Sequence, residues 1–245
     1  MSDLWIMTIG LAILGFISGM LGLGVAFAAL PFLSLFLPDL VHQVQPLTLL
    51  LNGATAMFAA VGFARSGFID WPKAIGLAVV TTLSAPLGSL LAQRTNASLI
   101  FYIYLAAVIF LAYTLFRPVK RDPNKVANYR LALLVTVPIS VLAGLLGIGP
   151  GFLLMPALIL VGFEAKHAAG MTALAVTLPS FSALLPHLST AIWDPTLTIA
   201  LVVAGSIASF IGARVTSLYV PPLRLKQLFG VVIVLMPLYR IVTML

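Results

Sequence analysis

Two copies of one glycine pattern are the residues best suited to bind a ligand through the backbone. The first copy reads Gly19-Met20-Leu21-Gly22-Leu23-Gly24, and the same spacing returns 125 positions later as Gly144-Leu145-Leu146-Gly147-Ile148-Gly149. Glycine allows unusual backbone dihedrals and a close approach of the backbone to a ligand. A helix that begins after such a break presents unpaired N–H groups and the positive end of its dipole. This chemistry suits an anion, especially a tetrahedral or pyramidal oxyanion.

Helices are predicted to restart near Val25 and Gly151, just after the two glycine patterns. The alternative role of the glycines is close packing of helices, which is common in membrane proteins. Their duplication at the centre of two overlong apolar segments favours a binding site. The predicted backbone contacts of the anion are Gly22, Gly24, Val25, Gly147, Gly149 and Gly151.

A polar stripe adds side-chain donors to these backbone positions. Thr48, Asn52 and Thr55 are spaced i, i+4 and i+7, so they share one face of a helix. The repeat offset carries Asn52 to Thr177 and Thr55 to Ser180. Amide and hydroxyl groups donate hydrogen bonds to an anion without the cost of a buried charge. We therefore predict that Asn52, Thr55, Thr177 and Ser180 contact the anion, with hydrogen bonding between helices as the other open role.

The titratable residues argue against an acidic proton or sodium relay. None of the six carboxylates is predicted mid-span; they are Asp3, Asp39, Asp70, Asp122, Glu164 and Asp194. His187 is predicted inside the sixth span, where it could bind the anion when protonated or carry a proton with it. A neutral histidine bonded to a neighbouring helix is equally open. His42 and His167 match between the two halves and are expected to cap helices at the interface.

The glycine patterns lie inside apolar segments that are too long for one membrane helix. Residues 4–37 would reach about 50 Å as a helix, against a hydrocarbon core of about 30 Å. We expect this segment, and its counterpart at 131–162, to break at the glycines and fold back. Broken helices at matching positions in two halves are typical of secondary transporters. Further spans are predicted near 46–65, 72–93, 98–116, 168–190, 196–217 and 224–244.

Composition indicates a polytopic membrane protein. Hydrophobic residues make up 62% of the chain and charged residues 8%, with a mean hydropathy of +1.17. The spans use nearly all 245 residues, which leaves no soluble catalytic domain. The absence of cysteine excludes disulfides and thiolate metal sites, and we expect no metal and no cofactor. The start of the chain lacks a basic n-region, so we expect no signal-peptide cleavage.

The distribution of basic residues predicts how the segments are threaded. If both broken segments are hairpins, 11 of the 13 basic residues share one side; if each crosses once, the split is 8 to 5. The positive-inside rule prefers the hairpins, with both termini periplasmic. The fold class is then an all-α integral membrane protein with two inverted repeats, each a Gly-broken hairpin plus three transmembrane helices. Its parts are a first repeat at 1–116, a basic cytoplasmic linker at 117–130 and a second repeat at 131–245, forming one transmembrane domain.

The chain resembles the TauE/SafE sulfite exporter family over nearly its whole length, from about Leu4 to Met244. The resemblance rests on the duplicated glycine motif, on Pro31 or Pro156 after it, and on a span opening at His42 or His167. The segments Lys166-His167-Ala168-Ala169-Gly170-Met171-Thr172 and Gly212-Ala213-Arg214 also resemble family signatures. Two departures from the family's glycine string are Gly24-Val25-Ala26 and Gly149-Pro150-Gly151, and they leave the substrate within the family open.

The resemblance implies a transporter that moves sulfite, a sulfonate or a related sulfur anion outward across the bacterial inner membrane. We expect a small anionic substrate and the lipid bilayer as partners, no nucleic acid, and we leave a homodimer open. A channel or facilitator for another small anion or neutral solute is the alternative. An intramembrane protease is disfavoured, because the chain has no His-Glu-x-x-His motif and no mid-span aspartate is predicted.

Overall fold

The computed structural model describes residues 2–92, 106, 127–146, 149–225, 227–228 and 231. This part of the chain is helical and contains no strand. Its helices are α1 (Ser2–Leu21), α2 (Ala26–Leu33), α3 (Gln45–Ala64), α4 (Trp71–Ala92), α6 (Tyr129–Leu146), α7 (Gly151–Leu160), α8 (Ala165–Leu184) and α9 (Pro195–Tyr219). A π-helical turn at Leu40–Val44 precedes α3, and a 3₁₀ turn at Leu185–His187 follows α8. Outside the described residues lie Gly147, most of the linker, most of 224–244 and all of the predicted span 98–116 except residue 106.

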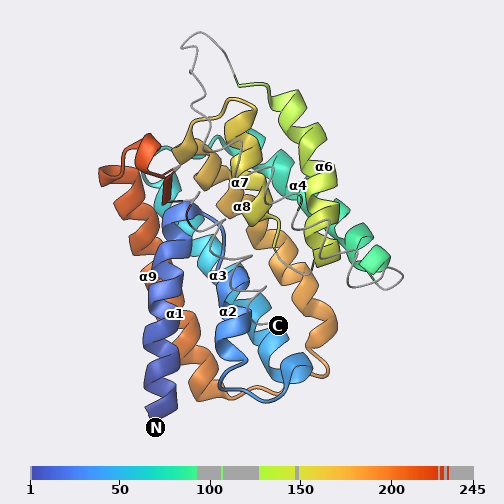
Figure 1. Cartoon of the computed structure of the whole chain (residues 1–245), viewed down its shortest axis with the longest axis vertical. Helices are drawn as coiled ribbons and strands as arrows, with labels where there is room; N and C mark the ends of the chain where they lie inside the picture. Colours follow the sequence, from blue (N-terminus) through green and yellow to red (C-terminus); the bar gives the residue numbers. More distant parts are fainter. Residues whose placement is uncertain are drawn as a thin grey trace.

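The first overlong segment breaks at the glycines, as predicted. Gly22 and Gly24 have φ values of +68° and +72°, a backbone region that favours glycine. The chain then turns back into α2, which runs down beside α1 in Figure 1. Met7 and Leu11 of α1 pack in one buried cluster with Leu33 of α2. The segment is therefore a hairpin of one long and one short helix.

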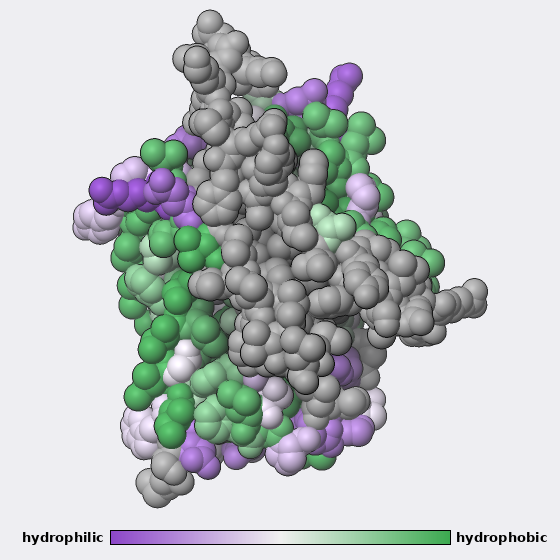
Figure 2. Space-filling view, viewed as in Figure 1, coloured by the Kyte–Doolittle hydropathy of each residue, from purple (hydrophilic) through white to green (hydrophobic). Residues whose placement is uncertain are grey.

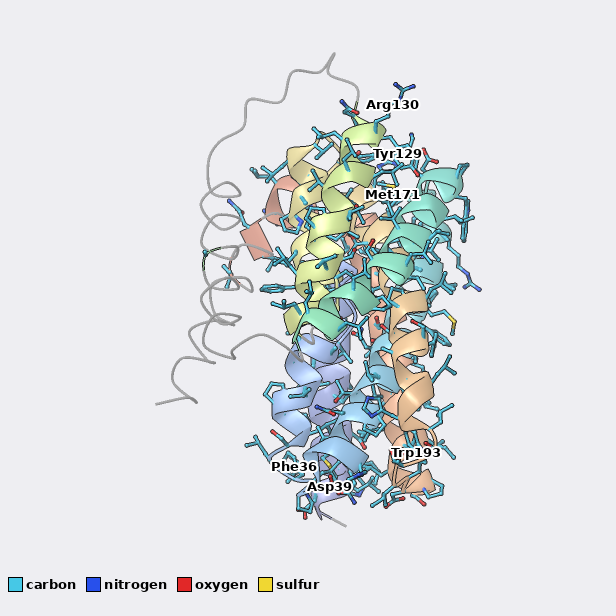
Figure 3. The ribbon with its side chains drawn as sticks, turned by 90° about the vertical axis from the view of Figure 1, so that its right-hand side faces the viewer. Phe36, Asp39, Tyr129, Arg130, Met171 and Trp193 are labelled. Carbon is cyan, nitrogen blue, oxygen red and sulfur yellow. The ribbon has the colours of Figure 1, made fainter. Side chains whose placement is uncertain are left out.

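The second overlong segment folds in the same way from the other end of the molecule. Helix α7 begins at Gly151 after the break, and the Asn128 N–H donates to the Val161 carbonyl at 3.3 Å across the open end. Arg130 lies at this open end, and Asp39 lies at the open end of the first hairpin. Figure 3 shows these two residues at the two far ends of the molecule. The two hairpins thus enter the helix bundle from opposite ends.

The long helices pack in matching pairs. Helix α1 lies along α9 and α6 along α4, while α3 contacts α9 and α8 contacts α4. Two glycines allow matching close approaches: Gly88 faces the Val141 carbonyl oxygen and Gly212 faces the Phe16 carbonyl oxygen. An added Cβ at either glycine would overlap that oxygen. Small residues bring membrane helices together in this manner.

Three described helices are long and apolar enough to cross a bilayer, at Asp3–Leu21, His42–Ala64 and Pro195–Tyr219. Exposed aliphatic side chains follow helical spacing on α9, at Ile199, Val203, Ile207 and Ile211. Where Figure 2 colours the surface, the flanks of the visible face are largely hydrophobic, and hydrophilic residues lie mainly towards the two ends. The chain is a multi-pass membrane protein.

The basic residues of the described part gather at one end of the bundle, called here the basic end. The Arg214 guanidinium donates to Ser66 Oγ at 2.7 Å, and the Lys166 ammonium donates to the Ser217 carbonyl at 2.8 Å. These bonds tie the end of α9 to the α3–α4 loop and to the start of α8. The six described basic residues of this end are Arg65, Lys73, Arg130, Lys166, Arg214 and Arg224. We call the opposite end, which holds Asp3, Asp39 and Asp194, the N-terminal end.

Candidate functional site at the hairpin tips

The two hairpin tips meet at Asn52, which is 2% exposed on α3. Its Oδ1 accepts a hydrogen bond of 2.8 Å from the Ala26 N–H, at the start of α2. Its Nδ2 donates to Ser180 Oγ on α8, also at 2.8 Å, and Ser180 Oγ donates to the Val176 carbonyl at 2.7 Å. One amide thus links the first tip to the helix that follows the second tip.

Glycine backbone closes around this amide from both hairpins. A Cβ at Gly149 would lie 3.1 Å from Asn52 Nδ2, and a Cβ at Gly24 would overlap Asn52 Oδ1. A Cβ at Gly151 would lie 2.7 Å from the Leu23 carbonyl oxygen, so the second tip also touches the first directly. Val25 is fully buried and caps α2. The structure therefore brings Gly24, Val25, Asn52, Gly149, Gly151 and Ser180 together.

Val176 is a contact that the sequence did not indicate. Its methyl groups lie 3.1 Å from the Cβ position of Gly24, 3.7 Å from that of Gly149 and 2.8 Å from that of Gly151. An apolar residue inside an apolar span cannot be recognised as a site residue from its type. Only its position next to Thr177 could have suggested that Val176 lies at the site. Val176 supplies the apolar wall of the tip junction.

Thr55 and Thr177 direct their hydroxyl groups to their own helices. Thr55 Oγ1 donates to the Leu51 carbonyl at 2.7 Å, and Thr177 Oγ1 donates to the Ala173 carbonyl at 2.9 Å. Such bonds to the preceding turn are a common fate of threonine in helices. The Thr55 hydroxyl also donates to the Asn52 backbone carbonyl at 3.3 Å, and within the described residues neither hydroxyl bonds to the Asn52 side chain or to a tip. Gly22 belongs to the first tip but packs against the Ala169 carbonyl of α8.

The prediction that His187 lies buried inside a span is wrong. Helix α8 ends at Leu184, and His187 closes the 3₁₀ turn that follows, where it is partly exposed. Its carbonyl accepts from the Ala191 N–H at 2.8 Å within the same loop. Pro186 directly before it favours such a turn, and the apolar residues around it made the span look longer than it is.

The described carboxylates lie at helix starts and loops, as predicted. Asp194 caps α9 by accepting from the Leu197 N–H at 3.1 Å, and Glu164 is the residue before α8. Asp70 pairs with Lys73 at 2.5 Å in the loop that leads into α4. The hydrogen bond from the Lys73 ammonium lowers the pKa of Asp70 below its ordinary value. No three His, Asp or Glu side chains within the described ranges lie close enough to hold a metal ion.

The tip junction therefore offers buried, uncharged hydrogen-bond donors beside a helix start. Asn52 Nδ2 carries two hydrogens, of which Ser180 takes one. Such a set of groups can bind a small anion or a polar solute without a permanently buried charge.

The family model of the sulfite exporter TauE/SafE matches residues 6–240 of this chain. The chain belongs to the TauE/SafE family. A probable membrane transporter protein of Haemophilus influenzae is 29% identical over 173 residues, which cover 66% of this chain and 65% of that protein. The chain thus covers slightly less than two thirds of this relative's length. No solved structure matches the chain. Both names describe transporters and neither describes an enzyme.

Proposed function

We propose that this TauE/SafE protein is a secondary transporter that exports a small sulfur oxyanion, sulfite or an organosulfonate, across the bacterial inner membrane. The anion binds near the midplane between the two Gly-rich hairpin tips. The observation that carries this proposal is the position of Asn52, whose amide bonds both to the start of α2 and to Ser180 of α8. A ligand held there touches both halves of the chain at once.

The chemistry of binding follows from the donors at this junction. Gly149 lies beside Asn52 Nδ2, because a Cβ there would be 3.1 Å from the nitrogen, and one N–H of this amide is not used by Ser180. The start of α2 adds backbone N–H groups and a partial positive charge. Hydrogen bonds to a charged oxygen are about twice as strong as neutral ones, so a few neutral donors suffice for an oxyanion. The proposed set is Gly22, Gly24, Val25, Asn52, Gly147, Gly149, Gly151 and Ser180, with Thr55 and Thr177 contributing only if their hydroxyls leave their own helices.

The proposal includes two inverted repeats, with the basic end in the cytoplasm and both termini in the periplasm. Opposite entry of the two hairpins supports the inversion, as do the matched helix pairs α1–α9 and α6–α4. The gathering of the described basic residues at one end supports the orientation, because cytoplasmic loops carry an excess of lysine and arginine. Transporters of this plan bind substrate where broken helices from both repeats meet.

A channel or facilitator for a small anion or neutral solute is the second candidate. The uncharged donors of the tip junction favour it, since they would also suit a neutral polar solute. Uptake of radiolabelled sulfite into proteoliposomes that contain the purified protein tests both proposals. A transporter gives saturable uptake that an added sulfonate inhibits, whereas a channel gives uptake that rises without saturation. Uptake equal to that of protein-free liposomes would contradict sulfite as a substrate.

A further inference from the structure

On α3 and α8, the two helices joined by the Asn52–Ser180 bond, two buried threonines have hydroxyl groups without any hydrogen-bond partner. Thr48 on α3 is 2% exposed and Thr172 on α8 is fully buried, and neither Oγ1 reaches an acceptor or donor. Thr216 on α9 is also buried and unpaired, whereas Thr136 on α6 donates to the Ala132 carbonyl of the preceding turn at 2.7 Å. A buried hydroxyl left unpaired costs about 1–3 kcal/mol, and Thr48 and Thr172 are the two of these threonines that lie on the helices of the tip junction.

The two hydroxyls flank the tip junction, one towards each end of the helix bundle. Thr48 lies one helical turn before Asn52 and on the same face of α3, towards the N-terminal end. Thr172 lies one turn before Val176 on the same face of α8, towards the basic end. Helices α3 and α8 pack together and run in opposite directions. One unpaired hydroxyl therefore stands on each side of the Asn52–Ser180 pair.

The residue before each threonine lines a surface pocket. Met171, directly before Thr172, lines a pocket of about 380 Å³ at the basic end, together with Lys73, His167, Asp70 and Glu164. Leu47, directly before Thr48, lines a smaller pocket of about 30 Å³ at the N-terminal end, together with Gln43. The Oε1 atom of Gln43 is buried and also has no partner.

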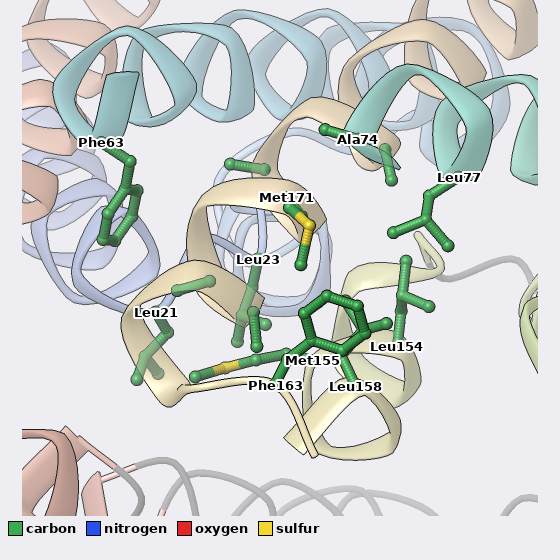
Figure 4. Packing of buried hydrophobic residues seen from close by; sticks show 14 of the residues in the cluster. Leu21, Leu23, Phe63, Ala74, Leu77, Leu154, Met155, Leu158, Phe163 and Met171 are labelled. Carbon is green, nitrogen blue, oxygen red and sulfur yellow. The ribbon is translucent and has the colours of Figure 1, made fainter. Parts of the chain in front are cut away.

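A buried apolar cluster separates the basic-end pocket from the tips. Met171, Leu77, Leu154, Leu158 and Phe163 pack together there between α4, α7 and α8 (Figure 4). The unpaired hydroxyl of Thr172 is a polar group beside this apolar barrier, on the helix that joins the pocket to the site.

We propose that Thr48 and Thr172 are further contacts of the translocated anion, one on each side of its central site. This inference rests on the proposed function and deepens it, because it assigns the steps between the site and the two surfaces. Each hydroxyl has no partner in the protein and is free to donate to a passing oxyanion. Several weak contacts in series let an anion move without being trapped at any one of them.

Isosteric variants test the inference. Thr48→Val and Thr172→Val keep the side-chain shape and remove only the hydroxyl. Each should lower kcat/KM for sulfite in proteoliposomes by roughly tenfold, the effect of one lost hydrogen bond. Thr48→Ser and Thr172→Ser should restore most of the rate. The melting temperature of the valine variants should equal or exceed that of the wild type, because the removed group has no protein partner.

Thr216→Val is the matched control. Thr216 is fully buried on α9 with an unpartnered hydroxyl and lies on neither α3 nor α8, so its variant should transport at the wild-type rate. If the wild type does not transport sulfite, the proposed function fails. If the wild type transports and either Thr48→Val or Thr172→Val matches Thr216→Val, the inference is overturned while the proposed function stands. A lowered melting temperature with no rescue by serine would assign these threonines to packing and also overturn it.

Discussion

The rings of Phe27 and Phe152 lie against each other, with centroids 6.3 Å apart and ring planes inclined by 33°. The two residues are 125 positions apart, so they hold the same place in the two copies of the glycine pattern. Equivalent residues of two repeats can touch only near the axis that relates the repeats. The contact supports our proposal of inverted repeats, whose axis would then lie beside the tip junction.

The glycines Gly88 and Gly212 extend the same relationship to the outer helices. They are 124 positions apart, and the carbonyls that they face, Val141 and Phe16, are 125 positions apart. The contact of α4 with α6 is therefore equivalent to the contact of α9 with α1. Each hairpin packs on a long helix of the other half. A movement of one half relative to the other would therefore change the packing of both hairpins.

The first prediction concerns topology. Single cysteines can be introduced freely, because the chain has none. Ser2→Cys and Asp39→Cys should react with an impermeant maleimide from the periplasmic side, and Asn124→Cys and Glu164→Cys only after the cytoplasmic side is exposed. The reason is the excess of basic residues at the end that holds Glu164. Labelling of Ser2→Cys and Asn124→Cys from the same side would refute the proposed threading.

The second prediction concerns Asn52. Asn52→Leu removes both the acceptor of the Ala26 N–H and the donor beside Gly149, so it should abolish sulfite transport. The lost cap of α2 should cost about 1 kcal/mol of stability. The matched control is Thr81→Val, which removes a buried bond of 2.8 Å from α4 to the Ala175 carbonyl of α8 and leaves both side-chain hydrogen bonds of Asn52 in place. That variant should lose a similar stability but keep transport, and equal transport in both variants would contradict the site.

The third prediction concerns the tip glycines. Gly149→Leu should leave a folded protein without transport, because its side chain enters the space beside Asn52 Nδ2 that we assign to the anion. Gly147→Leu is expected to behave alike. Gly88→Leu is the contrast, since any side chain there overlaps the Val141 carbonyl oxygen and should prevent folding. Size-exclusion chromatography and sulfite affinity separate these outcomes, and a monodisperse Gly149→Leu protein with wild-type affinity would refute the assignment.

The fourth prediction concerns acid stability at the basic end. The Lys73 hydrogen bond lowers the pKa of Asp70 from its ordinary 3.8, so the pair stabilises the fold above that pH and loses this effect as the pH falls through the lowered pKa. Lys73→Met should therefore reduce stability at pH 7 by about 1 kcal/mol or less, since the pair is partly exposed. The difference in melting temperature from wild type should shrink at acid pH. A difference that does not change with pH would contradict the pair's contribution.

Much of the architecture could be predicted from the sequence, because apolar spans and glycine breaks are local signals. The span predicted at 46–65 is α3 at Gln45–Ala64, and the returning helices begin at Ala26 and Gly151, close to the predicted Val25 and Gly151. The partners of Asn52 could not be predicted. Ser180 is 128 positions away, and its contact depends on how α3 and α8 pack.

The contacts of the predicted side-chain ligands could not be predicted from helical spacing. Helical spacing placed Thr55 on the stripe with Asn52, yet the Thr55 hydroxyl bonds to Leu51, and its own carbonyl accepts from Ser209 Oγ at 2.7 Å. Spacing fixes the face of a helix but not the rotamer or the neighbour on that face. The predicted position of His187 inside a span was wrong for another reason, since hydropathy alone does not identify the last turn of a membrane helix.

The most direct test of the central claim is sulfite flux in proteoliposomes under a potassium gradient clamped by valinomycin. With no carboxylate in the middle of a described span, a monoanion should move with the electrical potential alone. A potential of 100 mV is worth about 2.3 kcal/mol per charge, enough for roughly 50-fold accumulation. We predict that wild-type and His187→Ala proteins carry sulfite in proportion to the imposed potential, without any cation gradient, and that Asn52→Leu carries none. Wild-type flux that ignores the potential and follows a pH gradient would contradict this account.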